Sequence, residues 1–252
     1  MIIPILTETT EYLIINKPAG ISVHGDGKVD VYTLTDWILE RYPELASVGE
    51  PMELGGRIVL RPGIVHRIDK ETSGCLLIAK TQDAFLHFKN QFQQHTVEKI
   101  YHTFVYGVIK EKKGIIDVPI GRSKGDVRKW TIGGGARGLM REAITEYSVM
   151  GSIGTEDGKG STESSTFSFV ECRPKTGRTH QIRVHMKSLN HPIVCDSLYA
   201  PKRDQALGFS RLALHARAIS FHDTSGTPVS VTASYPEDFE KAVKNLERDT
   251  SL

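Results

Sequence analysis

Apolar segments rich in residues that favour β-strands recur along most of the chain, and this pattern constrains its fold more than any other feature. Each segment is short and ends at turn-forming residues, as Tyr12 to Asn16 ends at Lys17-Pro18. Strands of this kind have to pair with one another to satisfy their backbone hydrogen bonds. We predict strands over 12–16, 74–80, 97–109, 115–120, 143–150, 166–172, 216–222 and 229–233.

Other segments have the spacing of helices. Over 33–42 the apolar residues lie three or four apart, and Thr33 with Asp36 resembles a capping pair before the stop at Pro43. A stripe in 82–95 has the same spacing and is expected to face the core. It consists of Ala84, Phe85, Phe88 and Phe92. We predict helices over 33–42, 82–95 and 179–189, and a last helix from Pro236.

Strand runs mixed with a few helices, joined by short connections, are typical of an α+β fold. We expect a mixed, largely antiparallel β-sheet core with flanking helices. Gly133 to Gly135 is expected to form a turn and 151–165 an exposed loop. No linker composition divides the chain, so we expect a single domain over 1–252.

The cysteines exclude two kinds of scaffold. There are three, Cys75, Cys172 and Cys195, and none forms a CxxC pair. A zinc site or a disulfide framework is therefore not expected, and a reduced, cytoplasmic setting fits best. No apolar run approaches the roughly 18 residues of a membrane span.

Positive charge is concentrated in two places although the formal net charge is only +2. Segment 122–141 contains six Lys and Arg residues against one acid, Asp126, and segment 173–187 contains five and no acid. Segregated charge favours a basic face that binds a polyanion. Scattered charge on solvated loops is the alternative for either cluster taken alone.

The polar segment 66–74 separates two apolar runs and contains the first candidate site. Asp69 lies in its middle, followed by Thr72, Ser73 and Gly74. Loops of this composition on a rigid sheet often carry functional side chains. A simple Asx turn, in which Asp69 only caps the Thr72 or Ser73 amide, is the alternative.

Two further segments contain candidates. In 99–107 alternation places Tyr101 on the more polar face of a strand, where it either stacks on a base or half-buries its ring. Segment 174–185 combines a basic turn with a helix start that can bind phosphates, through Arg178 for example. His180 and His185 are five apart and do not share a helix face, so no metal site is expected.

Taken together, these segments resemble the RluA-type pseudouridine synthases. HRIDKETSG with LLIAK, KIYHTFVYG, and GRTHQIRVHMKSLNHPIVCDSLY followed by Leu214-His215-Ala216 resemble the three motifs of that family, in order. The opening IINKPAG resembles its first strand and turn, so the resemblance extends from about Tyr12 to Tyr235. Cys195 and Ala200 depart from it, because the family usually has glycine there, which concerns turn geometry more than chemistry.

The resemblance implies the pseudouridine synthase fold and a set of roles. Asp69 is the essential carboxylate, Tyr101 stacks on the target base, and Arg183 pairs with Asp69. The other implied RNA-binding residues are Arg67, which helps displace the base, Leu214, which packs near it, and Arg178 and His180, for phosphate contact and local scaffolding.

The implied reaction is the isomerisation of uridine in RNA, which needs no cofactor. We expect a monomer without a separate N-terminal RNA-binding domain, acting on rRNA in preference to tRNA. Two other functions remain as alternatives. One is a non-catalytic RNA-binding or ribosome-assembly protein; the other is a hydrolase that uses Asp69, or Ser73 with His66, although no GxSxG segment is present.

Overall fold

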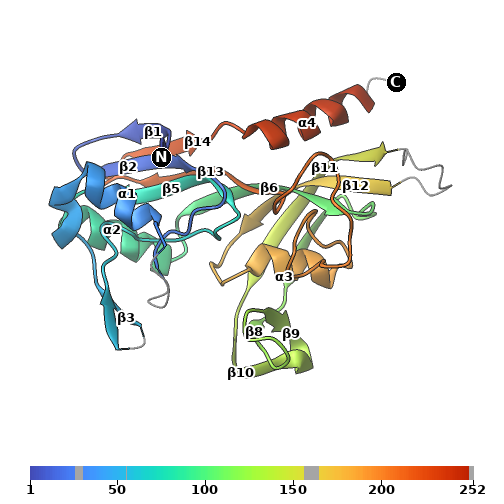
Figure 1. Ribbon diagram of the computed structural model, residues 1–252, viewed down its shortest axis with the longest axis horizontal. Helices are drawn as coiled ribbons and strands as arrows, with labels where there is room; N and C mark the ends of the chain where they lie inside the picture. Colours follow the sequence, from blue (N-terminus) through green and yellow to red (C-terminus); the bar gives the residue numbers. More distant parts are fainter. Residues whose placement is uncertain (26–30, 55, 156–164, 250–252) are drawn as a thin grey trace. The chain divides into compact units, whose positions relative to one another are not determined.

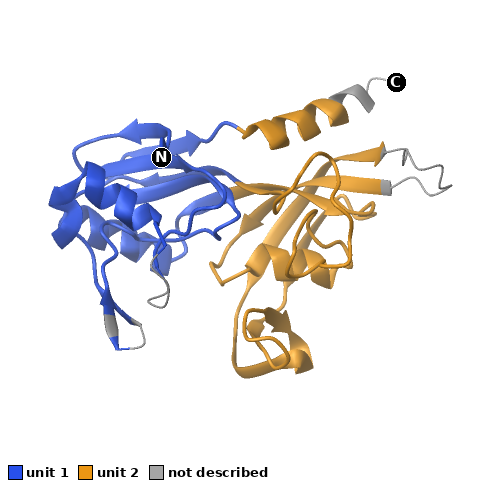
Figure 2. Ribbon diagram, viewed as in Figure 1, with its two compact units in different colours: residues 1–99, 216–234 blue, residues 100–215, 235–252 orange. Residues whose placement is uncertain are grey.

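The computed structural model describes residues 1–25, 31–54, 56–155 and 165–249 (Figure 1). The chain divides into two units. Unit 1 comprises residues 1–99 and 216–234, and unit 2 comprises residues 100–215 and 235–252 (Figure 2). The predicted single domain over 1–252 stays a prediction.

Unit 1 is built on paired strands from both ends of its sequence. Their order is β1 (Ile5–Glu8), β2 (Tyr12–Lys17), β5 (Ser73–Ala79), β13 (Leu214–His222) and β14 (Pro228–Thr232), and the first two residues of β13 belong to unit 2. The β1–β2, β2–β5 and β13–β14 ladders are antiparallel. All seven residues of β5 are buried, which explains why the strand after Ser73 carries no polar side chain and does not alternate.

Capping residues set the starts of the unit 1 helices α1 (Leu34–Arg41) and α2 (Gln82–Gln93). Thr33 and Asp36 form the predicted capping box of α1. The Thr81 hydroxyl accepts from the Ala84 amide at the start of α2. A 3₁₀ turn, η1 (Pro43–Ser47), and a hairpin of β3 (Met52–Leu54) and β4 (Arg57–Val59) lie between them in sequence.

The α2 stripe packs where it was expected to pack. Ala84, Phe85 and Phe88 are buried in one cluster with Tyr12 and Phe221, and Phe92 packs against that cluster. The Phe88 ring meets the Tyr12 and Phe221 rings edge to face, at 5.8 and 5.2 Å between centroids. This cluster forms a rigid core under the strands of unit 1.

Unit 2 has its own antiparallel strands, in the order β6 (Glu98–Tyr106), β12 (Ser165–Pro174), β11 (Ile144–Thr155) and β7 (Lys113–Asp117). The first two residues of β6 belong to unit 1. Phe104, Phe169, Phe209 and Phe239 fill the core. Phe239 comes from the last helix, α4 (Glu237–Asp249), and α3 (Gln181–Ser188) also belongs to unit 2.

The segment that connects β7 to β11 in the sequence forms a small three-stranded sheet. Its strand order is β10 (Ala136–Arg141), β8 (Ile120–Ser123) and β9 (Trp130–Ile132), and η2 (Gly133–Gly135) follows β9 at the predicted glycine turn. Ile120 and Ala143 pack with Val184 of α3 and with Tyr199. This contact fixes the small sheet against α3.

The structure confirms an α+β fold with mixed, mostly antiparallel sheet structure and flanking helices. Two local predictions are wrong. Residues 151–155 and 165 of the expected loop belong to β11 and β12, because pairing of these strands continues past a bulge at Met150; the part 156–164 lies outside the described residues. The expected strand over 115–120 is divided between β7 and β8, because Pro119 lacks a backbone donor.

Candidate active site

Two glycines hold the loop that carries Arg67 and Asp69. Gly63 has φ +64°, and a Cβ atom there would lie 2.1 Å from the Ala79 carbonyl oxygen. Gly74 has φ +115°, and its Cβ would lie 2.2 Å from the Ala216 carbonyl oxygen. Only glycine fits at both ends, so the backbone of the loop is pressed against its neighbours on either side of Asp69.

A buried lysine ties this loop to the turn after β2. Lys17 has no exposed surface, and its ammonium donates to the carbonyl oxygens of Pro18, Ile21 and Lys70 at 2.8, 2.9 and 3.1 Å. The Gly20 amide donates to the same Lys70 carbonyl at 2.9 Å. Lys70, the residue after Asp69, is therefore fixed by two donors, one at the end of β2 and one in the turn that follows it.

Backbone contacts also close the loop itself. The Thr72 amide donates to the main-chain carbonyl of Asp69 at 3.1 Å, which forms a tight turn. Asp69 is half-buried and Arg67 is exposed. The turn thus presents two oppositely charged side chains from a fixed backbone.

His66 supports the loop as a neutral ring. Its Nε2 accepts from the Leu77 amide at 2.9 Å, and the ring stacks on Phe92 at 4.5 Å between centroids. Loss of hydration, with a smaller effect of the Lys99 charge, lowers the pKa of His66 to about 3. The Nε2 atom of His66 already accepts a backbone hydrogen bond, and the lowered pKa makes the ring weakly basic. His66 is therefore a poor general base, which argues against the hydrolase alternative.

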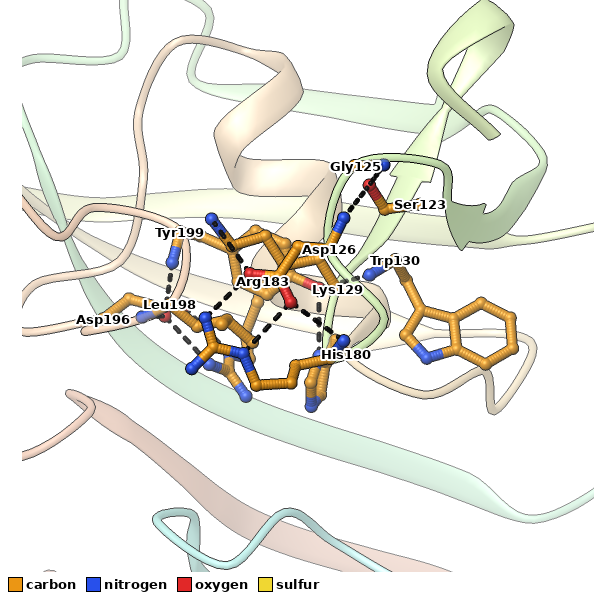
Figure 3. A network of polar contacts seen from close by, with 11 residues as sticks. Ser123, Gly125, Asp126, Lys129, Trp130, His180, Arg183, Asp196, Leu198 and Tyr199 are labelled. Atoms are coloured by element: carbon orange, nitrogen blue, oxygen red, sulfur yellow. Dashed lines mark hydrogen bonds and ion pairs between the residues drawn. The ribbon is translucent and has the colours of Figure 1, made fainter. Parts of the chain in front are cut away.

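In unit 2, α3 presents Arg183, and a buried carboxylate holds it (Figure 3). Arg183 donates from Nε and Nη2 to the two carboxylate oxygens of Asp196, both at 2.8 Å. One oxygen of Asp196 also accepts from the Leu198 and Tyr199 amides at 3.0 Å. Asp196 is 1% exposed, so this bidentate pair is fully built into the protein.

Tyr199 joins Arg183 to His180 in the same network (Figure 3). The guanidinium lies 5.0 Å from the centroid of the Tyr199 ring, and the phenol oxygen lies 2.9 Å from His180 Nδ1. The same oxygen accepts from the Trp130 amide of β9 at 2.9 Å. His180 has a left-handed φ of +58° directly before α3, a strained position that often marks functional sites.

The other predicted residues of unit 2 have structural contacts. Arg178 Nε donates to the Glu142 carbonyl at 2.9 Å, and its amide donates to the Gln181 side chain at 3.0 Å; its implied role stays a prediction. Leu214 is buried in the unit 2 core at the start of β13. Tyr101 is half-buried on β6, opposite Cys172 of β12.

The basic residues of segment 122–141 lie on the small sheet and its loops. Arg122, Lys124, Arg137 and Arg141 are exposed. Arg128 is 74% exposed although it pairs with Asp126 at 2.8 Å. The charge predicted from the sequence therefore faces solvent, together with the exposed apolar side chain of Leu139.

The predicted site residues are divided between the units. Asp69 and Arg67 belong to unit 1, and Tyr101, Arg183 and the remaining candidates belong to unit 2. Within unit 2 the structure brings His180 and Arg183 together around Tyr199. The predicted pairing of Arg183 with Asp69 stays a prediction.

Lys17, Asp196 and Tyr199 are support residues that the sequence analysis did not assign. Lys17 has a detectable signal, since a charge ends the apolar run of β2 directly before a proline. Asp196 and Tyr199 lie within the third motif, but nothing in their spacing indicates contact with α3. Among the described residues, no group of three or more His, Cys, Asp or Glu side chains is arranged to hold a metal ion.

Comparison with known proteins assigns this chain to a class. Residues 11–188 match the family described as RNA pseudouridylate synthase. The chain belongs to this family, and it is an RNA uridine isomerase by class. No described helix is long and apolar enough to cross a membrane.

The similarity to known relatives extends over nearly the whole chain. An uncharacterized RNA pseudouridine synthase of Synechocystis sp. is 38% identical over 244 residues, which cover 96% of this chain and 68% of the relative. Ribosomal large subunit pseudouridine synthase D of Zymomonas mobilis is 37% identical and covers 96% of this chain and 72% of its own length. The solved structure of human RNA pseudouridylate synthase domain containing 1 has a TM-score of 0.71 at 26% identity, over 93% of this chain and 84% of that one.

Proposed function

We propose that the chain converts uridine to pseudouridine in large-subunit ribosomal RNA, with Asp69 as the essential carboxylate. The observation that carries the proposal is the fixed loop around Asp69, held by Gly63, Gly74 and the buried Lys17 ammonium. Proteins named ribosomal large subunit pseudouridine synthase D, from Zymomonas mobilis and Xanthomonas campestris, are 37% and 36% identical to this chain and favour the ribosomal substrate.

The reaction breaks the N1–C1′ bond of uridine, turns the base and joins C5 to C1′. The C5 proton is lost and N1 gains one, so the product is an isomer of the substrate. An ionised Asp69 would act either as nucleophile at C1′ or as base at C2′. A fixed carboxylate suits both roles because its approach to the sugar is set in advance.

The target nucleotide has to leave the RNA stack to reach Asp69, which costs a few kcal/mol. We assign Tyr101 to stack on the extruded base and Arg67 to help displace it. We assign Arg183 to pair with Asp69, as the family resemblance implies, and Asp196 would hold its guanidinium in a fixed orientation. The basic residues of 122–141 would supply salt-dependent contacts to RNA phosphates.

The test is a tritium-release assay on ribosomal RNA labelled at uridine C5. Asp69→Asn is expected to keep its fold by circular dichroism and its RNA affinity, and to release no tritium. Asp83→Asn, the same change on an exposed residue in the first turn of α2, is the control and should react like wild type. Tritium release by Asp69→Asn near the wild-type rate would overturn the assignment of the carboxylate.

The RNA target has its own test. Pseudouridines are mapped in ribosomal and transfer RNA from cells with and without the gene. Loss of a pseudouridine from large-subunit rRNA is expected; loss from tRNA alone would replace the ribosomal substrate by tRNA. If both RNAs keep every pseudouridine and the purified protein still binds RNA, the non-catalytic alternative holds.

A further inference from the structure

Three cationic or polar side chains of unit 1 lie around the loop that precedes Asp69: His24, Arg61 and Arg67. Arg67 donates from Nη1 to Nε2 of His24 at 3.2 Å. His24 Nδ1 lies 2.9 Å from the Gly25 carbonyl oxygen, and a carbonyl only accepts, so Nδ1 carries the proton. His24 is therefore neutral, and its Nε2 serves as the acceptor that orients Arg67.

Arg61 lies at the start of the same loop, and part of its guanidinium is buried without a partner. Its Nε is shielded from water and has no hydrogen-bond acceptor among the described residues. Its Nη1 donates to the Met52 sulfur, a weak acceptor, at 4.0 Å. Arg61 thus meets no carboxylate in the described structure.

The electrostatics agree with this geometry. Burial lowers the pKa of Arg61, the nearby charge of Arg67 lowers it further, and Glu50 only partly opposes them. Glu50 already pairs with Lys89, with 2.5 Å between Nζ and the carboxylate. Burial also lowers the pKa of His24; the hydrogen bond to Gly25 opposes this shift, and the charges of Arg67 and Arg61 add to it.

A buried charged group without a partner is costly, and two guanidinium groups close together repel each other. Both costs are relieved when an anion binds between or beside them. A phosphodiester suits guanidinium groups well, because their planar donors match its oxygens. An RNA strand that delivers a nucleotide to Asp69 carries such phosphates on both sides of the base.

We propose that Arg61 binds a backbone phosphate of the RNA next to the target uridine, beside Arg67, which the neutral His24 holds in place. This inference rests on the proposed function, since it takes the bound polyanion to be the RNA substrate. Arg61 is then a substrate-binding residue and His24 a positioning residue. Neither role follows from the motifs of the sequence, because Arg61 precedes them and His24 lies in a different loop.

The first experiment measures RNA binding as a function of salt. A fluorescein-labelled RNA stem-loop is titrated by anisotropy with wild type, Arg61→Met and Arg41→Met over a series of KCl concentrations. Methionine keeps an apolar stem, and Arg41, exposed in the last turn of α1, is the matched control. For Arg61→Met we expect affinity at low salt to fall about tenfold and the slope of log K against log salt to fall by about 0.7–0.9. Wild-type affinity and slope would refute the proposal.

The second experiment separates a ligand site from a structural role. Without phosphate, Arg61→Met should melt at or above the wild-type temperature, because the substitution removes an uncompensated buried charge. Added inorganic phosphate should raise the melting temperature of wild type and Arg41→Met more than that of Arg61→Met. A clear loss of stability of Arg61→Met in phosphate-free buffer, or equal stabilisation of all three proteins, would contradict the proposal.

The two proposals fail in different ways. If Arg61→Met loses RNA affinity as expected while the wild type releases no tritium from any RNA, only the isomerase assignment falls. If the wild type is active and Arg61→Met binds and reacts like it, only the phosphate site falls.

Discussion

Both carboxylate oxygens of Asp196 accept from the Arg183 guanidinium, each at 2.8 Å, and the same carboxylate caps the Leu198 and Tyr199 amides. The aspartate is 1% and the arginine 9% exposed. One side chain therefore fixes both the orientation of Arg183 and the turn that carries Tyr199. This arrangement makes Asp196 a positioning residue for a guanidinium that we assign to the active site.

Asp196→Ala is expected to lower the free energy of unfolding by about 3–5 kcal/mol, because it removes the bidentate carboxylate partner of a buried guanidinium. Asp196→Asn keeps the shape and should lose less stability, yet its kcat should fall while KM for RNA changes little. Urea denaturation and tritium release measure the two effects. Asp204→Asn, on an exposed aspartate of the same unit, is the control; equal kcat in both Asn variants would remove the positioning role.

Tyr101 is expected to act through its ring and its hydroxyl separately. Tyr101→Phe keeps the ring, so RNA affinity should be preserved while turnover slows. Tyr101→Ala should also weaken RNA binding by about tenfold, since base stacking contributes roughly 1–3 kcal/mol. Anisotropy titrations and single-turnover kinetics distinguish the two, with Tyr32→Ala on an exposed tyrosine as control. Equal affinity and rate in all these proteins would contradict the stacking role.

Gly63→Ala tests the anchored end of the Asp69 loop. The added methyl carbon would lie 2.1 Å from the Ala79 oxygen, and φ is positive, so the backbone has to move. Gly226→Ala is the matched control: φ is +85°, but nothing lies within 4 Å. We expect about 1–2 kcal/mol lost for Gly226→Ala and clearly more for Gly63→Ala, measured by thermal unfolding. Similar losses would mean that the Gly63 contact does not constrain the loop.

His66 should make stability depend on pH. Its pKa is about 3 in the folded protein and about 6.5 when unfolded, so the unfolded state binds more protons between these values. The stabilising component is complete above about pH 6.5 and is lost as the pH falls toward 3. His66→Gln should remove up to about 1.4 kcal/mol per pH unit of this dependence. His222→Gln, on an exposed histidine, should retain it; denaturant titrations across this range are the measurement.

Repeating patterns were enough to predict much of the fold. The stripe of α2 and the buried β5 strand were found because burial on one face, or on both, leaves a regular apolar pattern. The β3–β4 hairpin and the small sheet were missed because strands of three to six residues are too short to show a regular pattern. Residues 151–155 were misjudged because Gly151 resembles a loop residue, while cross-strand pairing with Phe169 keeps it in β11.

The candidate site, like the fold, could be predicted only in part from the sequence. Asp69, Tyr101 and Arg183 were identified through motifs that resemble a known family. Lys17 and Asp196 were not, because what they do depends on contacts with Lys70, 53 residues away, and with Arg183, 13 residues away. Contacts between segments that are separated in this way leave no periodic pattern in a sequence.

Unit 1 is assembled from two parts of the chain that are synthesised far apart in time. The Cys75 thiol in β5 contacts the Arg217 carbonyl in β13, 142 residues later. At translation rates of about 5–20 residues per second, β5 leaves the ribosome roughly 7–28 s before β13 exists. During that interval a strand that is fully buried in the folded protein lacks one neighbour, so the nascent protein should depend on ribosome-associated chaperones more than a protein with local strand pairing would.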